Sequence, residues 1–355
     1  MMFRSSPSIA GRGAASNPDN RFAPTRQQAE DDGWYQEQTP ESQTTSVRHE
    51  RAKTVISHNQ SPDVPFDRSV NPYRGCEHGC IYCFARPTHA YWDLSPGLDF
   101  ETRLIAKTNL AERLEAQLSK LGCRPKPIAL GINTDAYQPI ERELQLTRQA
   151  LEVLLRFRHP VSIVTKSALI LRDLDLLAEL AADNLVNVAF SLTTLNDDLK
   201  RILEPRAATG QARLKAMASL HGRGVPVQVL TAPIIPMIND GELEQMLQAA
   251  REAGAQSAGY VLLRLPLEVA GLFEDWLQRH FPQRASHVMS LVRQCHGGKN
   301  YDSRFGSRMR GKGPFAQLLA RRFALAARRY GLAQGPGQPL NCRAFAVPGR
   351  QLALF

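Results

Sequence analysis

Three cysteines stand close together near residue 80, in a pattern that suits a metal centre. Cys76, Cys80 and Cys83 form a C-x3-C-x2-C loop. Thiolates ligate soft metals and iron–sulfur clusters, and a short loop can turn three sulfurs toward one cluster. Three cysteines bind three of the four irons of a cubane cluster, which leaves the fourth iron open to a substrate or cofactor. Gly75 and Gly79 would let the loop backbone approach the inorganic core without a Cβ clash.

Two other kinds of metal centre fit part of this pattern. A structural zinc site takes four ligands, commonly from C-x2-C pairs, and His78 or His89 could supply the fourth. A bacterial ferredoxin uses C-x2-C-x2-C with a distant fourth cysteine, which differs from the spacing here. The remaining cysteines, Cys123, Cys295 and Cys342, are scattered and predict no second cluster. We therefore expect one metal centre in a reducing compartment, and the spacing alone leaves its metal open.

From Pro65 onward, apolar runs alternate with amphipathic stretches, which predicts alternating strands and helices. The predicted strands are short apolar runs at residues 128–131, 161–165, 186–192, 227–234 and 258–263. The helices predicted to follow them span residues 147–158, 173–182, 211–221, 241–253 and 267–279. An extended segment before Cys76 and a helix over residues 109–121 bring the total to six strand–helix units.

This alternation implies an α/β fold with a parallel sheet and helices outside it. Six units are fewer than the eight of a closed TIM barrel, so a partial, TIM-like (β/α)6 barrel is the simplest arrangement. A doubly wound sheet is the alternative that the pattern leaves open. In both folds the active site lies at the carboxyl ends of the strands, so the cysteine loop should lie there too.

Composition divides the chain into three parts. Residues 1–52 are polar and poor in aliphatics, which predicts a disordered N-terminal tail that is neither a signal peptide nor a transit peptide. Residues 60–283 form the predicted core barrel, and residues 284–355 a basic C-terminal extension. Between Arg284 and Tyr330 there are eleven Lys or Arg and one acid, Asp302, which gives this stretch the whole net charge of +10.

The basic stretch suits contacts with phosphates, which supply most of the nonspecific affinity for nucleic acids. A solvated helix face is the alternative explanation. No apolar run is long enough to cross a bilayer, so we expect a cytoplasmic protein with no membrane partner. The sequence carries no signal of its oligomeric state.

The cysteine loop and several other segments together resemble a known family. The matching segments are N-P-Y-R-G-C-E-H-G-C-I-Y-C-F-A-R-P from residue 71, G-I-N-T-D-A-Y-Q-P-I-E from residue 131, V-T-K-S from residue 164, E-P-R from residue 204 and G-G-K-N-Y-D-S-R-F-G-S-R-M-R-G from residue 297. C-x3-C-x2-C with an aromatic residue before the last cysteine, here Tyr82, resembles the radical SAM superfamily. The residues around this motif and in the other segments resemble the spore photolyase-like branch of the superfamily, often labelled DNA repair photolyase.

The resemblance implies a [4Fe–4S] cluster held by Cys76, Cys80 and Cys83, and S-adenosyl-L-methionine on the open iron. A low-potential electron donor would reduce the cluster, which cleaves SAM to methionine and a 5′-deoxyadenosyl radical that abstracts hydrogen. The candidate SAM contacts, which lie in the loop or where strands end, are Tyr82, Asn133, Thr134, Asp135, Lys166, Ser191, Glu204 and Arg206. These polar residues also have structural interpretations. Asn133, Thr134 and Asp135 could form an ordinary turn, and Lys166 could be an ordinary lysine at a strand end. Glu204 and Arg206 could form a surface salt bridge.

The expected function is that of a radical SAM enzyme, with a nucleic acid as the favoured candidate substrate. The alternative is a nucleic-acid-binding protein whose Fe–S or zinc site is structural, and modification of a peptide or protein is a third candidate. Phe84 stands where spore photolyases have a tyrosine, and no motif carries over the cysteine and tyrosines that return a hydrogen atom in those enzymes. The catalytic residues therefore stay unassigned.

Overall fold

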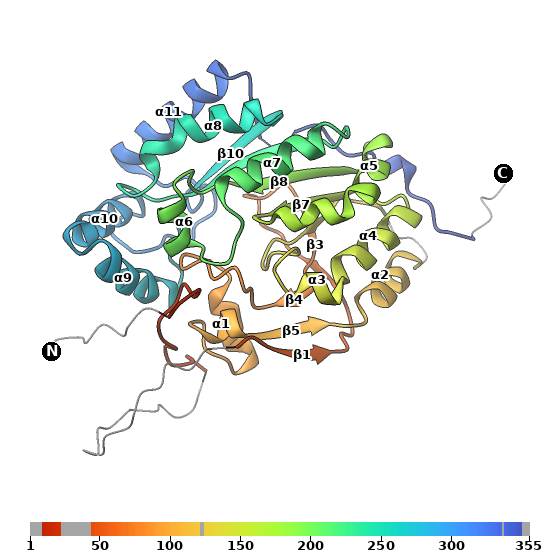
Figure 1. Ribbon diagram of the computed structural model, residues 1–355, viewed down its shortest axis with the longest axis horizontal. Helices are drawn as coiled ribbons and strands as arrows, with labels where there is room; N and C mark the ends of the chain where they lie inside the picture. Colours follow the sequence, from red (N-terminus) through yellow and green to blue (C-terminus); the bar gives the residue numbers. More distant parts are fainter. Residues whose placement is uncertain (1–8, 23–43, 121–123, 336, 350–355) are drawn as a thin grey trace, which may run out of the picture.

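One large sheet forms the centre of the protein (Figure 1). The computed structural model describes residues 9–22, 44–120, 124–335 and 337–349. The sheet has the strand order β11-β10-β9-β8-β7-β6-β3-β2. Its six central strands are parallel: β3 (Arg68–Val70), β6 (Ile128–Leu130), β7 (Val161–Thr165), β8 (Val186–Ser191), β9 (Val227–Ile234) and β10 (Ser257–Leu262). At the edges, β2 (Ile56–His58) is antiparallel to β3, and β11 (Ala333–Gln334) is parallel to β10.

Each of the six parallel strands is followed by helix, as the sequence predicts. The main helices are α2 (Leu110–Leu118), α4 (Leu146–Arg156), α5 (Leu174–Ala182), α7 (Gly210–His221), α8 (Leu243–Glu252) and α9 (Val269–His280). Shorter helices are α1 (Asp99–Thr102), α3 (Glu141–Leu144), η1 (Arg86–Trp92), η2 (Ala168–Asp173), η3 (Asp240–Glu242) and η4 (Cys342–Ala344). The predicted α/β class with six parallel βα units is confirmed. No pairing joins β2 to β11 in the described part of the chain, so the barrel is partial.

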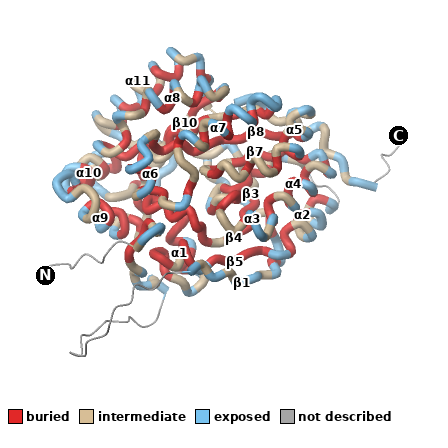
Figure 2. Tube along the Cα trace, viewed as in Figure 1, coloured by how far each residue is buried: buried red, intermediate tan, exposed pale blue. Residues whose placement is uncertain are grey.

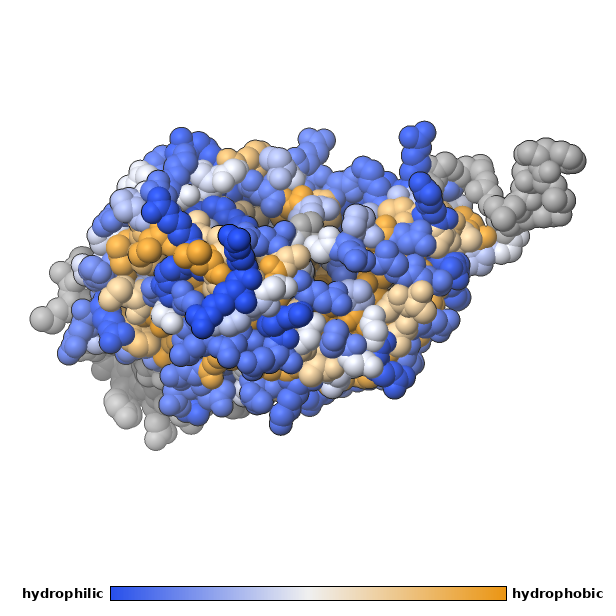
Figure 3. Space-filling view, turned by 90° about the horizontal axis from the view of Figure 1, so that it is seen from above, coloured by the Kyte–Doolittle hydropathy of each residue, from blue (hydrophilic) through white to orange (hydrophobic). Residues whose placement is uncertain are grey.

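Apolar side chains of the strands and of the inward helix faces form the core. Figure 2 shows buried residues concentrated along the strands and the adjoining helix faces. Val161 and Ile163 of β7 and Leu151 of α4 are fully buried. Alternating buried positions in β7 place one set of side chains on each face of the sheet. None of the helices in the described ranges is long and apolar enough to cross a membrane, and hydrophilic side chains cover most of the face in Figure 3.

A small sheet and two helices are among the elements absent from the prediction. A small sheet combines β1 (Ser46–Glu50), β5 (Arg103–Lys107) and β4 (Tyr73–Arg74), in the order β1-β5-β4. Helix α6 (Asp197–Leu203) follows β8, and α10 (Pro282–Cys295) follows α9. The small sheet is built from short strands far apart in sequence, so no local periodicity marks it.

The N-terminal segment differs from the disordered tail that its composition predicts. Residues 1–8 and 23–43 lie outside the described residues, but residues 9–22 and 44–52 pack on the barrel. Strand β1 pairs in parallel with β5, and Ala14 is almost completely buried. Backbone groups, small residues and polar side chains pack these residues on the barrel, so the low aliphatic content did not reveal the packing.

The basic C-terminal part returns to the barrel. Helix α11 (Gly313–Arg329) packs on α8, and Arg322 Nη2 lies 2.7 Å from Glu244 Oε2. The hairpin between β2 and β3 reaches toward the Gly-rich segment, where Arg308 Nε lies 2.5 Å from Asp63 Oδ2. This ion pair links one edge of the open sheet to a segment beside the other edge.

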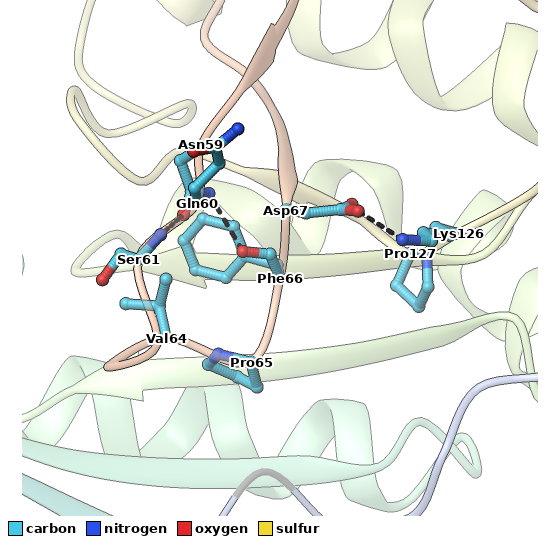
Figure 4. A pocket seen from close by; sticks show the side chains of 9 residues that line it. All are labelled: Asn59, Gln60, Ser61, Val64, Pro65, Phe66, Asp67, Lys126 and Pro127. Atoms are coloured by element: carbon cyan, nitrogen blue, oxygen red, sulfur yellow. Dashed lines mark hydrogen bonds and ion pairs between the residues drawn. The ribbon is translucent and has the colours of Figure 1, made fainter.

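A cavity of about 330 Å³ lies under the same hairpin (Figure 4). Its lining includes Phe66, Asp67, Lys126 and Pro127, and the ion pair between Lys126 and Asp67 spans 2.6 Å. These residues immediately precede β3 and β6, so the cavity lies at the amino ends of the strands. The cysteine loop follows the strands and lies at the opposite end.

Candidate functional site

The three cysteines lie in one irregular loop that follows β3 and β4. Cys76 and Cys80 are buried, and Cys83 is half-buried. Tight turns shape the loop, since the N–H of Gly79 donates to the Cys76 carbonyl at 3.4 Å and the N–H of Cys83 donates to the Cys80 carbonyl at 3.2 Å. Burial raises the pKa of the Cys76 thiol well above its usual range and that of Cys80 to about 12. A thiolate in this loop therefore needs a nearby positive charge, which a bound metal supplies.

The loop glycines are required by protein packing. Gly75 and Gly79 have φ of +77° and +68°. A Cβ on Gly75 would lie 2.8 Å from Leu104 Cδ2, and a Cβ on Gly79 would lie 2.8 Å from Glu101 Oε2. Protein atoms crowd both glycines, and the approach of an inorganic core, which the sequence suggested for them, stays a prediction. In the described part of the chain, no group of three or more His, Cys, Asp or Glu side chains is arranged to hold a metal ion.

Three predicted residues come together at the carboxyl ends of β7 and β8. The Lys166 ammonium donates to Ser191 Oγ at 2.9 Å and lies 5.9 Å from the centre of the Tyr82 ring. Ser191 Oγ in turn donates to the Ala232 carbonyl at 2.9 Å. Parallel strands end at the same edge of a sheet, which is why residues distant in sequence meet here. Tyr82 belongs to the cysteine loop, so the loop lies beside Lys166 and Ser191.

Asp135 fastens the end of β6 to its neighbours. Its carboxylate accepts hydrogen bonds from the Lys166 N–H at 2.7 Å and from Thr165 Oγ1 at 2.8 Å, and it lies 3.3 Å from His78 Nδ1. Burial alone would raise the pKa of Asp135, but the His78 imidazole and the backbone donors outweigh burial and lower it to about 2. The residues before it differ in exposure: the buried Thr134 donates to a backbone carbonyl, whereas Asn133 is exposed.

Glu204 is fully buried behind Tyr82, at the centre of a second network. It accepts hydrogen bonds from the Tyr82 hydroxyl and from Thr193 Oγ1, the latter at 2.7 Å, and pairs with the buried Arg213. Arg213 also donates to the Ser191 carbonyl at 2.7 Å. Burial would raise the pKa of Glu204, but the charge of Arg213 and the nearby Lys166 lower it to about 2.

The surface salt bridge between Glu204 and Arg206, which is the alternative interpretation of these residues, is not formed. Arg206 instead extends to Glu77 in the cysteine loop, with 3.1 Å between Nη2 and Oε1. Glu77 also accepts from the Ile140 N–H at 2.8 Å. The E-P-R segment thus contacts the cysteine loop on two sides, through Glu204 to Tyr82 and through Arg206 to Glu77.

Sequence reasoning missed two buried arginines. Arg213 lies on the same stripe of α7 as the buried Ala216, Met217 and Leu220, so a charge on an apolar helix face was the available signal. Arg86, in the quoted cysteine segment, is fully buried and pairs with Glu101. Nothing around Glu101 in the sequence marks it. Cys123, whose role was open, lies outside the described residues, and Cys295 packs in the core.

The chain shares its sequence pattern with a large enzyme family and with uncharacterised proteins. Residues 70–250 match the family model of the Radical SAM superfamily. An uncharacterised protein of Mycobacterium tuberculosis is 40% identical over 233 residues, which cover 65% of this chain and 68% of the relative. An uncharacterised protein of Methanocaldococcus jannaschii is 27% identical over 233 residues, covering 66% of this chain and 83% of the relative.

Solved structures of spore photoproduct lyase are similar in fold. The lyase complexed with dinucleoside spore photoproduct superposes with a TM-score of 0.59 at 14% identity, over 81% of each chain. A double mutant of the lyase with bound AdoMet and dinucleoside spore photoproduct gives a TM-score of 0.58 at 14% identity, over 81% of this chain and 80% of the lyase chain. At this identity the likeness concerns the fold.

The Glu204 network makes a prediction about stability. Replacing Glu204 by Gln leaves Arg213 buried without a carboxylate, which we expect to lower the free energy of unfolding by about 3–5 kcal/mol at neutral pH. A carboxylate whose pKa is lowered from 4.5 to about 2 contributes stability above pH 4.5 and loses it as the pH falls through 2. Denaturant unfolding at several pH values should therefore show that the difference in free energy of unfolding between wild type and Glu204→Gln becomes smaller below pH 4.5. Glu179→Gln, at an exposed position of α5, is the control, and a pH-independent difference would contradict this account.

Proposed function

This chain belongs to the radical SAM superfamily, and on that basis we propose that it uses a [4Fe–4S] cluster to cleave S-adenosylmethionine reductively for hydrogen abstraction. The observation that carries the proposal is the loop of Cys76, Cys80 and Cys83 at the carboxyl ends of a parallel sheet. The donor set fits the cluster in its chemistry, because three soft thiol ligands lie in one short, mostly buried loop, although the three side chains are not gathered around one point in the described part of the chain. When bound, the cluster supplies the electron that cleaves the sulfonium of SAM. The proposed donor of that electron is a low-potential redox partner.

The chain's own residues would bind and orient SAM beside the loop. We assign the methionine carboxylate to Lys166, which has no carboxylate within ion-pair distance among the described residues. Ser191 is the proposed ribose contact, Tyr82 the proposed adenine contact, and Asn133 an exposed polar group at the same end of the sheet. The distances from Lys166 to Ser191 and to Tyr82 support a common site for these contacts.

Four other predicted contacts are better explained as positioning residues. Thr134, Asp135, Glu204 and Arg206 each make hydrogen bonds or ion pairs with protein groups around the loop. Asp135 holds the Lys166 backbone, and Glu204 holds the Tyr82 hydroxyl. We therefore propose that Asp135 and Glu204 act on SAM through Lys166 and Tyr82. Thr134 instead holds the backbone of Tyr73, and Arg206 holds Glu77 of the loop.

We further propose that the substrate of this enzyme is anionic, with nucleic acid as the favoured class. Several charges of the basic stretch are neutralised locally, since Arg304 pairs with Asp302 and Arg322 with Glu244. Arg264, just after β10 and outside that stretch, forms no ion pair with a carboxylate within the described ranges. Its guanidinium lies 4.4 Å from the centre of the ring of Phe84, which directly follows Cys83. A cation and an exposed aromatic ring beside the cysteine loop suit a phosphate and a base. The likeness in fold to a lyase solved with a dinucleoside agrees with this class.

The cluster proposal makes a direct prediction about iron. Anaerobically reconstituted protein should bind about four irons per chain and release 5′-deoxyadenosine when a reductant and SAM are added. Cys83→Ala should abolish cluster binding, whereas Cys342→Ala, far from the loop in sequence, should retain it. Iron analysis and chromatography of the products are the measurements. Stoichiometric zinc in place of iron, with no 5′-deoxyadenosine, would favour a structural metal in a nucleic-acid-binding protein.

The Lys166 assignment predicts a loss of SAM affinity. Lys166→Met removes the charge but keeps a similar length, so the dissociation constant of SAM should rise at least about tenfold. Anaerobic titration calorimetry on cluster-loaded protein measures it. Lys215→Met, an exposed lysine on α7, is the matched control. If wild type, Lys166→Met and Lys215→Met bind SAM with equal affinity, Lys166 does not contact SAM.

The anionic-substrate proposal predicts a salt-dependent contact. Arg264→Gln should weaken binding of a fluorescein-labelled single-stranded oligodeoxynucleotide and reduce the slope of log affinity against log salt by about one. Fluorescence anisotropy at several salt concentrations gives both quantities. Arg201→Gln, an exposed position of α6, should leave them unchanged. A variant with the wild-type slope would argue against a phosphate at Arg264.

A further inference from the structure

Residues 9–22, here called the N-terminal strap, lie against the outside of the cysteine loop. The backbone N–H groups of Gly13 and Ala14 donate to the two carboxylate oxygens of Glu101, each at 2.9 Å. The Arg12 side chain donates to the Glu101 carbonyl at 2.9 Å. One buried carboxylate at α1 thus holds two consecutive backbone groups of the strap.

The strap touches the backbone of the loop itself. A Cβ placed on Gly13 would lie 1.8 Å from the Gly79 carbonyl oxygen, so only glycine fits at this point. Ala14 is almost completely buried in the same apolar cluster as Cys80, Ile81 and Tyr82. The strap therefore packs on the turn that runs from Cys76 to Cys80.

Glu101 connects the strap to the loop through a second contact. Its carboxylate pairs with Arg86, and both side chains are fully buried. Arg86 Nε donates to the Cys80 carbonyl at 3.0 Å, and Arg86 Nη1 donates to the Gly97 carbonyl at 2.9 Å. The strap and the Cys80 backbone are thus two ends of one buried network.

Further contacts fasten the rest of the strap. Asn17 and Asp99 exchange two hydrogen bonds, at 2.9 and 3.1 Å. Arg21 lies 2.7 Å from Glu268 at the start of α9, and it also donates to the Pro87 carbonyl at 3.1 Å. These contacts span the loop from α1 to α9, so the strap crosses its outer side.

We propose that the N-terminal strap is part of the cluster site, where it fixes the turn between Cys76 and Cys80 and keeps water and dioxygen from its outer side. This inference rests on the proposed function, because the shielded group is the proposed cluster. The protein shell around a metal site controls solvent access and orients the ligands. Gly13, Glu101 and Arg86 are accordingly positioning residues, and none of them is a ligand.

The test compares Gly13→Ala with Gly271→Ala in the full-length protein. Each adds one methyl group, but Gly271 lies on α9 with no atom in the way of a Cβ. In the first measurement the unloaded proteins are alkylated anaerobically with iodoacetamide, and each cysteine is quantified by peptide mass. We expect Cys80 in Gly13→Ala to react about tenfold faster, because lifting the strap exposes the turn. Cys83, already half-exposed, should change little and serves as the internal reference.

The second measurement follows the loaded proteins in air through loss of the visible absorbance of the cluster. Gly13→Ala should lose its cluster about tenfold faster than wild type, with Gly271→Ala at the wild-type rate. Equal alkylation of Cys80 and equal cluster lifetimes in all three proteins would overturn the strap proposal. A general loss of folding would instead raise the reactivity of Cys295, which is buried in the core away from the loop, and that result would also count against it. Wild-type protein that binds no iron would contradict the proposed function, while the alkylation of unloaded protein still decides whether the strap covers the turn.

Discussion

The loop that carries the three thiols has almost no regular secondary structure, so its shape depends on two buried carboxylates. Glu101 holds it from outside through Arg86, and Glu204 holds it from the sheet side through Tyr82. A buried ion pair is tolerated only when further hydrogen bonds satisfy the remaining donors and acceptors. Both pairs meet this condition, since Glu101 receives two backbone N–H groups and Glu204 receives Thr193 in addition to Arg213. The loop is therefore held on two sides by buried ion pairs whose remaining acceptors are hydrogen-bonded.

The parallel sheet adds a second constraint by gathering polar groups at one edge. Asp135 ties β6 to β7, Lys166 reaches from β7 to Ser191 on β8, and Ser191 reaches the Ala232 carbonyl on β9. The ends of β6, β7, β8 and β9 are thus connected one to the next by side chains. Arg213 connects these strand-end contacts to the Glu204 network, because it contacts both Glu204 and the Ser191 carbonyl. The cysteine loop and the strand ends form one hydrogen-bonded unit.

The sequence predicted the parts of this unit that leave a local signal. Cysteine spacing identified the loop, and apolar runs located the strands that bring Lys166 and Ser191 together. Glu101 gave no signal, because a carboxylate on a four-residue helix looks like any exposed acid until its partners are known. The strap escaped prediction because its key contacts use backbone N–H groups and residues with little or no side chain, such as Gly13 and Ala14. Arg206 was predicted as a site residue, but its partner Glu77 lies far earlier in the chain and no periodicity links the two.

The long sequence separation within the Tyr82–Glu204 network has a consequence for biosynthesis. These two residues are 122 positions apart, and translation at about 5–20 residues per second separates their synthesis by roughly 6–25 s. During that interval the thiols exist on a nascent chain in which β6, β7, β8 and finally Glu204 are still being made. Formation of the native loop therefore has to await synthesis of β6, β7, β8 and Glu204, as is general for parallel topologies rich in non-local contacts. The cysteines must stay reduced and unreacted until then, and the proposed cluster would enter the loop only after this network can form.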